Sequence, residues 1–172
     1  MNHLSQWPIY KSLKIVYCQL LWESTGKDLS TLKKNNLILL NHTSKEFADQ
    51  IFLTVLTVVE DNENIKDRSI NLMLSNDGSI KEYNRKYLGN DALTDVISFP
   101  SDIDFMPFLG DIIIDIDVAD EQKGKKSLNE ELQFLFLHGL LHLLGYDHLS
   151  AEAEITMKFK EKEYFSKIRE NN

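Results

Sequence analysis

The sequence predicts an α/β (α+β) fold, in which a small mixed four-stranded sheet is covered by helices in a single domain. Two observations lead to this class. Short segments that alternate apolar and polar residues are separated by segments with helical spacing. The chain has 172 residues, of which 42% are hydrophobic, so it is long enough for one ordinary globular core and too short to expect two.

Four short segments are predicted strands. They are rich in aliphatic residues, and they are Leu37–Leu40, Ser69–Ser75, Asp95–Pro100 and Asp111–Val118. In the last segment, aliphatic residues fill every second position, while Asp111, Asp115 and Asp117 share the opposite face. This pattern predicts a strand with one solvent-exposed face. A second, oxygen-ligated metal at the three aspartates is the less favoured interpretation.

Helical patterns lie between these strands. Thr43 followed by Glu46 matches a capping box, which predicts that a helix begins there. Its buried stripe would consist of Phe47, Ile51, Val55 and Val58 or Val59. Residues 79–88 also have helical spacing and end at Gly89.

A further helix is predicted at the centre of the core. Ser127 and Glu130 form a second capping box, and Leu128–Leu144 is apolar on nearly all sides. Gly145 is a natural residue for its C-terminal end. We therefore expect a buried central helix, and it is the helix that carries the histidines described below.

The chain is predicted to consist of an N-terminal extension of unknown role, residues 1–36, and a functional domain, residues 37–172. The extension has no sustained period and contains one candidate helix at about Ile9–Trp22. Its apolar run Ile15–Trp22 is broken by Gln19 and is too short for a membrane helix or a signal peptide. We therefore expect no membrane partner.

Cysteine content and net charge exclude several kinds of site and of binding partner. Cys18 is the single cysteine, which excludes an intramolecular disulfide and a zinc site built on several thiolates. This favours a reducing, cytoplasmic location. The net charge of −8 argues against a broad basic surface that coats nucleic acid, and no DNA binding is expected.

Three of the five histidines fall within eleven residues. His138 and His142 are four residues apart on the predicted central helix, so their rings project from one face, one turn apart. Gly145 allows a left-handed turn that returns His148 to the same face. Buried imidazoles that only hydrogen-bond are the alternative, but the spacing favours one metal ion held by three histidines.

The chemistry of this metal depends on residue 139. The spacing matches that of metzincin proteases, H-E-x-x-H-x-x-G-x-x-H, but Gly139 replaces the glutamate that serves as their general base. Three imidazoles leave a coordination position open, as in catalytic zinc sites, unless Asp147 is a fourth ligand. Asp147 is equally suited to orient a histidine. We expect one Zn²⁺, although imidazole also suits nickel, copper and iron.

The stretch HGLLHLLGYDH, residues 138–148, resembles the signature of the YbeY family. LTDVISFP (93–100) and LGDII (109–113) resemble two further blocks of that family, and the resemblance extends from about Leu37 to Ile168. It implies a metal-dependent hydrolase that acts as a single-strand-specific endoribonuclease in 3′-end maturation of small-subunit ribosomal RNA and in ribosome quality control. The implied partners are single-stranded ribosomal RNA and the small ribosomal subunit.

One position departs from the family pattern. The family commonly carries an arginine after the tyrosine in N-x-x-Y-R, where this chain has Leu88. Arg85, one turn earlier, is the candidate to supply a guanidinium instead. With Asp95 and Asp147 it completes our candidate catalytic set. Thr94, Asp95 and Ser98 are candidates for the cleft, and the alternative for each is a local hydrogen bond at the start of a strand.

Two other function classes stay open. The first is a zinc peptidase whose general base comes from elsewhere, such as Asp147. The second is a non-catalytic ribosome-assembly factor with a structural zinc, in which a fourth protein ligand would fill the coordination sphere.

Overall fold

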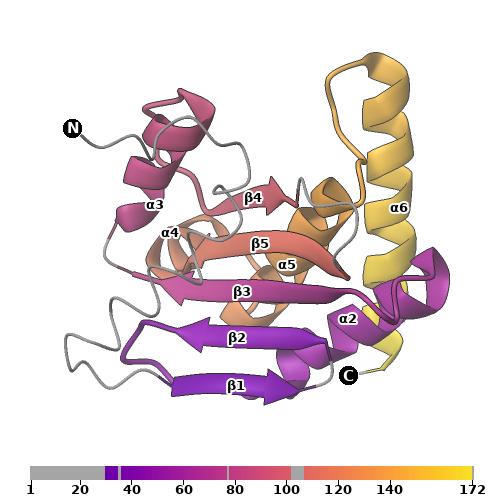
Figure 1. Ribbon diagram of the computed structural model, residues 1–172, viewed down its shortest axis with the longest axis horizontal. Coiled ribbons are helices and arrows are strands. Elements are labelled where there is room, and N and C mark those ends of the chain that lie inside the picture. Colours follow the sequence, from indigo (N-terminus) through magenta and orange to yellow (C-terminus); the bar gives the residue numbers. More distant parts are fainter. Residues whose placement is uncertain (1–29, 35, 77, 102–106, 172) are drawn as a thin grey trace.

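The computed structural model describes residues 30–34, 36–76, 78–101 and 107–171, which form one mixed sheet with helices on both faces (Figure 1). In spatial order the strands are β1 (Ser30–Lys34), β2 (Leu37–Asn41), β3 (Ser69–Ser75), β5 (Phe108–Asp115) and β4 (Val96–Pro100). β2, β3 and β5 are parallel, whereas the edge strands β1 and β4 run antiparallel to their neighbours.

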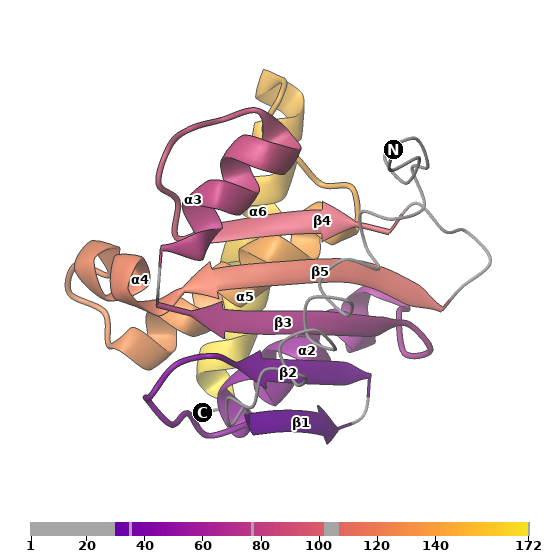
Figure 2. The ribbon, with the colours of Figure 1, turned by 60° about the vertical axis from the view of Figure 1, so that its left-hand side comes forward.

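The helices divide between the two faces of the sheet (Figures 1 and 2). One face is covered by α2 (Gln50–Glu63), α5 (Leu128–Leu143) and α6 (Ala151–Glu170), and the larger hydrophobic core lies beneath them. The other face packs against α3 (Ser79–Tyr83) and the following π-helical turn η2 (Asn84–Leu88). α4 (Ile116–Gln122) follows β5. No helix in the described part of the chain has the length and apolar character needed to cross a membrane.

The predicted fold class is confirmed, and the sheet has one strand more than predicted. The fifth strand, β1, pairs with β2 from Ser30 to Lys34, within the segment predicted as an extension. Its sequence, STLKK, has a single aliphatic residue, so it shows no apolar period, as is common for edge strands. The candidate helix at Ile9–Trp22 lies outside the described residues.

The two predicted capping boxes have different outcomes. The second is confirmed, because the Ser127 hydroxyl accepts a hydrogen bond from the Glu130 amide while the Ser127 amide donates to the Glu130 carboxylate. The first is wrong, since α2 begins at Gln50. The Thr43 hydroxyl instead donates to the side-chain oxygen of Asn41 at 2.7 Å, so it holds the loop after β2.

The predicted solvent-exposed face of the strand at 111–118 is also wrong. Asp111 and Asp115 are 0% and 2% exposed, because β5 lies between β3 and β4 with both of its faces covered. The strand ends at Asp115, whose carboxylate accepts hydrogen bonds from the amides of Asp117 and Val118 and caps α4. Asp111 accepts one from Asn71 at 2.7 Å. These aspartates therefore serve the fold.

Candidate metal centre

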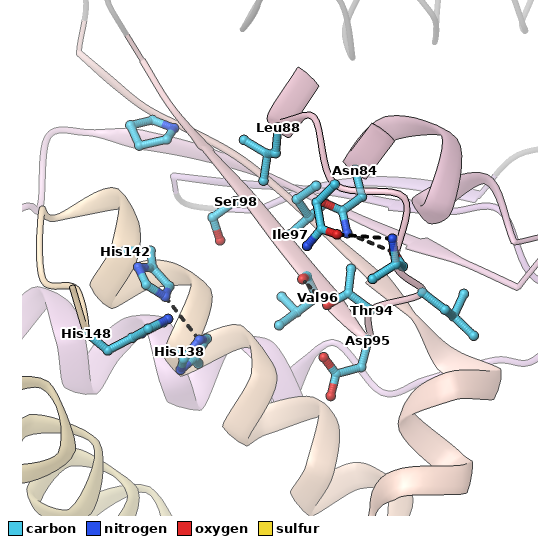
Figure 3. Close-up of a pocket in the computed structure, with 14 residues that line it drawn as sticks. Asn84, Leu88, Thr94, Asp95, Val96, Ile97, Ser98, His138, His142 and His148 are labelled. Carbon is cyan, nitrogen blue, oxygen red and sulfur yellow. Dashed lines mark hydrogen bonds between the residues drawn. The ribbon is translucent and has the colours of Figure 1, made fainter. Parts of the chain in front are cut away.

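His138 and His142 project from the last two turns of α5 toward one another (Figure 3). Their ring centroids are 4.6 Å apart, and their Nε2 atoms are 3.1 Å apart. The four-residue spacing on a helix produces this approach, as predicted.

The third histidine reaches the same place through a turn. Gly145 adopts a φ of +90°, in the left-handed region, and its amide donates to the His142 carbonyl at 3.0 Å. The Tyr146 amide donates to the Leu141 carbonyl at 3.0 Å, which folds the chain back along α5. The His148 ring then lies 6.1 Å from that of His138 and 5.2 Å from that of His142.

A carboxylate from another helix contacts this cluster. Glu161, on α6, lies with Oε1 2.6 Å from Nδ1 of His138. The prediction from sequence did not include Glu161. Because Nδ1 of His138 is occupied by this contact, Nε2 is the ring nitrogen that remains for a ligand, and it is the atom that faces His142.

Two properties of the histidine nitrogens suit a metal ion: imidazole nitrogen is a common metal ligand, and one pair of these nitrogens has the separation that a shared ion requires. Two imidazole nitrogens on one tetrahedral zinc lie about 3.3 Å apart, given Zn–N distances of about 2.0–2.1 Å. The 3.1 Å between Nε2 of His138 and Nε2 of His142 is close to this value, and it also suits a hydrogen bond between two neutral rings. In the described residues no group of three or more His, Cys, Asp or Glu meets the geometry of a metal site as it stands.

The surroundings of His142 favour the neutral ring. Burial is the largest cause that lowers its pKa, and the nearby His138 and His148 lower it further, against a hydrogen bond with the Tyr146 backbone. A neutral imidazole is the form that binds a metal.

The three histidines line one side of a pocket with a volume of about 550 Å³. The opposite side is formed by the start of β4 and the segment before it (Figure 3). Thr94, Asp95 and Ser98 all line this pocket, as predicted for the cleft. The Thr94 hydroxyl donates to the Val96 carbonyl at 3.0 Å, so Thr94 makes the local bond that was the alternative for it.

Residue 139 faces the sheet rather than the pocket. A Cβ atom at Gly139 would lie 2.9 Å from Cγ2 of Ile112 and 3.0 Å from Oγ of Ser98. α5 therefore approaches the sheet closely at this residue, and no larger side chain fits without movement. The glutamate of the metzincin pattern has no space here.

Comparison with known proteins identifies the family. The family model described as Endoribonuclease YbeY matches residues 34–169, which include all three histidines and both upstream blocks. The chain belongs to the YbeY family. Its members carry the name endoribonuclease, which is the hydrolase class predicted from the sequence, and the predicted family resemblance is confirmed.

Individual relatives agree with this assignment. An Endoribonuclease YbeY from Nautilia profundicola is 45% identical over 110 residues, 60% of this chain and 75% of the relative. Another from Persephonella marina is 42% identical over 115 residues, 62% of this chain and 74% of the relative. The solution structure of TM1509 from Thermotoga maritima matches with a TM-score of 0.52 and 25% identity, over 77% of this chain and 87% of that protein.

The position at which this chain departs from the YbeY family pattern lies at the pocket. Leu88, 58% exposed, lines it, whereas Arg85 does not. Among the described residues that line the pocket, none is Lys or Arg. The structure thus places the predicted guanidinium of Arg85 outside the pocket lining.

Asp147, the remaining candidate catalytic residue, is also absent from the pocket lining. Its Oδ1 accepts a hydrogen bond from the Leu149 amide at 2.9 Å, which forms a turn around His148. Asp147 therefore shapes the loop that carries the third histidine.

Proposed function

We propose that this chain is a zinc-dependent endoribonuclease that cleaves single-stranded RNA, with one ion held by His138, His142 and His148. The observation that supports the proposal most is the gathering of three imidazole rings at the side of a pocket. Three such ligands leave one position open, as in catalytic zinc sites. Bound zinc would supply a water with a pKa lowered to about 7 and a Lewis acid for a phosphoryl oxygen.

The protein's own groups at the pocket would position the RNA. Asp95 and Ser98 line the pocket opposite the histidines, and in the proposal they accept hydrogen bonds from ribose hydroxyls or base amino groups. Asp95 is in addition the one carboxylate among the described residues that line the pocket, and hence our candidate proton acceptor. Arg85 would contact phosphate away from the pocket, and Asp147 would hold His148 in place.

The substrate we propose is ribosomal RNA. Membership of the YbeY family and the three motifs support a role in 3′-end maturation of small-subunit ribosomal RNA and in ribosome quality control, with the small subunit as partner and the cytoplasm as location.

A second candidate is a ribosome-assembly factor that binds RNA without cutting it. One observation favours it, namely that no Lys or Arg is found among the described residues of the pocket lining, so within this part of the chain the phosphate charge would be met by the metal alone. A zinc peptidase has less support, because close packing at Gly139 removes the usual position of its base.

Cleavage of a single-stranded RNA by zinc-loaded protein tests the proposal. His142→Ala, purified identically, controls for contaminating ribonuclease. We expect cleavage by the wild type and loss of at least a hundredfold in the variant, with addition of a chelator giving a similar loss. RNA binding without cleavage in either protein would instead support the assembly factor.

A further inference from the structure

Glu161 occupies an unusual position on α6. Its neighbours at helical spacing on the same stripe, Met157, Tyr164 and Ile168, are at most 2% exposed and pack in the core. The Glu161 side chain is itself only 15% exposed. A carboxylate on the buried stripe of a helix requires a partner, because desolvation disfavours its charge.

That partner is His138. Glu161 Oε1 lies 2.6 Å from Nδ1 of His138, a short separation as expected when the acceptor is a carboxylate. Since the contact joins α6 to α5 across 23 residues of sequence, tertiary packing of the two helices produces it. The three buried neighbours of Glu161 fix the position of α6, so the carboxylate is held in place before any ligand arrives.

The contact has a direct consequence for ligand binding. A neutral imidazole carries its proton on either ring nitrogen, and a carboxylate at Nδ1 selects the form with the proton on Nδ1. The lone pair is then on Nε2, which faces His142. The same contact restricts rotation of the ring about its side-chain torsions.

We propose that Glu161 is a positioning residue of the metal centre, which fixes the tautomer and the orientation of His138 for the ion. This inference rests on the proposed function only in requiring that the three histidines bind a metal. In this role Glu161 acts through His138.

A purely structural role for Glu161 makes a different prediction. If the contact served only to join α5 to α6, its loss would lower the stability of the metal-free protein and leave metal affinity unchanged. If Glu161 positions His138, the loss would appear mainly in metal affinity and in the ligand field. Both quantities therefore need to be measured on the same variants.

Glu161→Gln is the central variant, because it keeps the shape and removes the charge. Glu163→Gln is the matched control, since Glu163 lies two residues further along α6 and pairs with Lys167 at 2.6 Å. Glu161→Asp keeps the charge on a shorter side chain and tests for partial rescue. Zinc affinity is measured by competition with a chromophoric chelator, the thermal unfolding of metal-free protein by calorimetry, and the ligand field by visible absorption of the Co²⁺-substituted protein.

We expect Glu161→Gln to weaken zinc binding by about 10- to 100-fold and to alter the Co²⁺ absorption, with little change in metal-free unfolding. The zinc affinity of Glu161→Asp would fall between those of Glu161→Gln and the wild type, and Glu163→Gln would match the wild type.

Wild-type zinc affinity in Glu161→Gln would overturn the inference, as would a loss confined to metal-free stability. Wild-type protein that binds zinc but cleaves no RNA would refute the proposed function and leave the role of Glu161 intact. Failure of the wild type to bind zinc would refute both.

Discussion

The hydroxyl of Tyr146 lies 3.2 Å and 3.1 Å from the two carboxylate oxygens of Glu63. Glu63 is the last residue of α2, while Tyr146 belongs to the short loop between α5 and His148. Lys160 and Tyr164 of α6 also donate to Glu63, Lys160 at 2.8 Å. Burial would raise the pKa of Glu63, but these hydrogen bonds hold it below its usual value. A charged carboxylate therefore ties the loop of the third histidine to two helices.

We predict that Tyr146→Phe weakens metal binding as well as the fold. The variant keeps the ring and removes one of several donors to Glu63, so the metal-free protein should lose about 1 kcal/mol in its free energy of unfolding. His148 becomes less restrained, and zinc affinity should fall by roughly three- to tenfold. Chelator competition and urea unfolding measure the two effects. Unchanged zinc affinity together with reduced stability would show that the bond serves the fold alone.

A second prediction concerns Asp111. Burial raises the pKa of Asp111 to about 7, against the hydrogen bond from Asn71, which lowers it. Well below pH 3.8, the ordinary pKa of an aspartate, the carboxyl is protonated in both folded and unfolded chains. As the pH rises toward 7, the unfolded chain ionises while the folded chain stays protonated, so the folded state becomes progressively less favoured. The penalty at pH 8 is at most about 4 kcal/mol, since one pKa unit corresponds to about 1.4 kcal/mol.

Asp111→Asn should therefore gain stability relative to the wild type as the pH rises. The amide oxygen can still accept from Asn71, and the variant no longer ionises. We expect the difference in melting temperature, variant minus wild type, to be small or negative at pH 4 and to increase between pH 4 and 8, measured by calorimetry on metal-free protein. A difference that is constant with pH would show that Asp111 is charged throughout this range in the fold.

The segments predicted most accurately from the sequence are those in which the spacing of apolar residues shows which face is buried. β3 has the predicted limits, Ser69–Ser75, and the central helix ends within one residue of its predicted end. Asp111 and Asp115 were misplaced because an alternating strand looks half exposed whether its polar face meets water or a second layer of the protein. The covering layer comes from distant parts of the chain, and period alone does not reveal it.

The part of the candidate site that was predicted consists of residues close together in the sequence. His138, His142 and His148 lie on one helix and its following turn, so spacing alone brings them together. Glu161 was missed, because packing of α6 against α5 brings it there. A signal was present, since Met157, Glu161 and Tyr164 share a helical stripe, and a charge on such a stripe indicates a buried partner.

A third prediction tests the close approach of α5 to the sheet. In Gly139→Ala, the new methyl group would overlap Ile112 and Ser98, which should destabilise the fold by about 1–3 kcal/mol. The higher helix propensity of alanine offsets about 1 kcal/mol of this cost. Adding Ile112→Val removes the Cδ1 atom that lies 3.0 Å from the new methyl, so the double variant should be less destabilised than the sum of the two single changes. Strict additivity in urea unfolding would contradict the proposed overlap.

The last prediction concerns the charge of the pocket. Leu88 is 58% exposed at a pocket whose described lining has neither Lys nor Arg, so Leu88→Arg would place a cation beside the proposed RNA site at little cost in buried surface. We expect tighter binding of a single-stranded RNA, and a plot of log affinity against log salt that is steeper by about 0.7 for one added phosphate contact.

The control for Leu88→Arg is Ile155→Arg, which adds the same charge on α6 at an exposed residue outside the pocket lining. Binding is measured by fluorescence anisotropy at several salt concentrations, with the His142→Ala background preventing cleavage. An equal gain in both variants would assign the effect to net charge alone. A gain confined to Leu88→Arg would show that RNA passes the pocket at Leu88, and that phosphate binding there is limited by the missing cation.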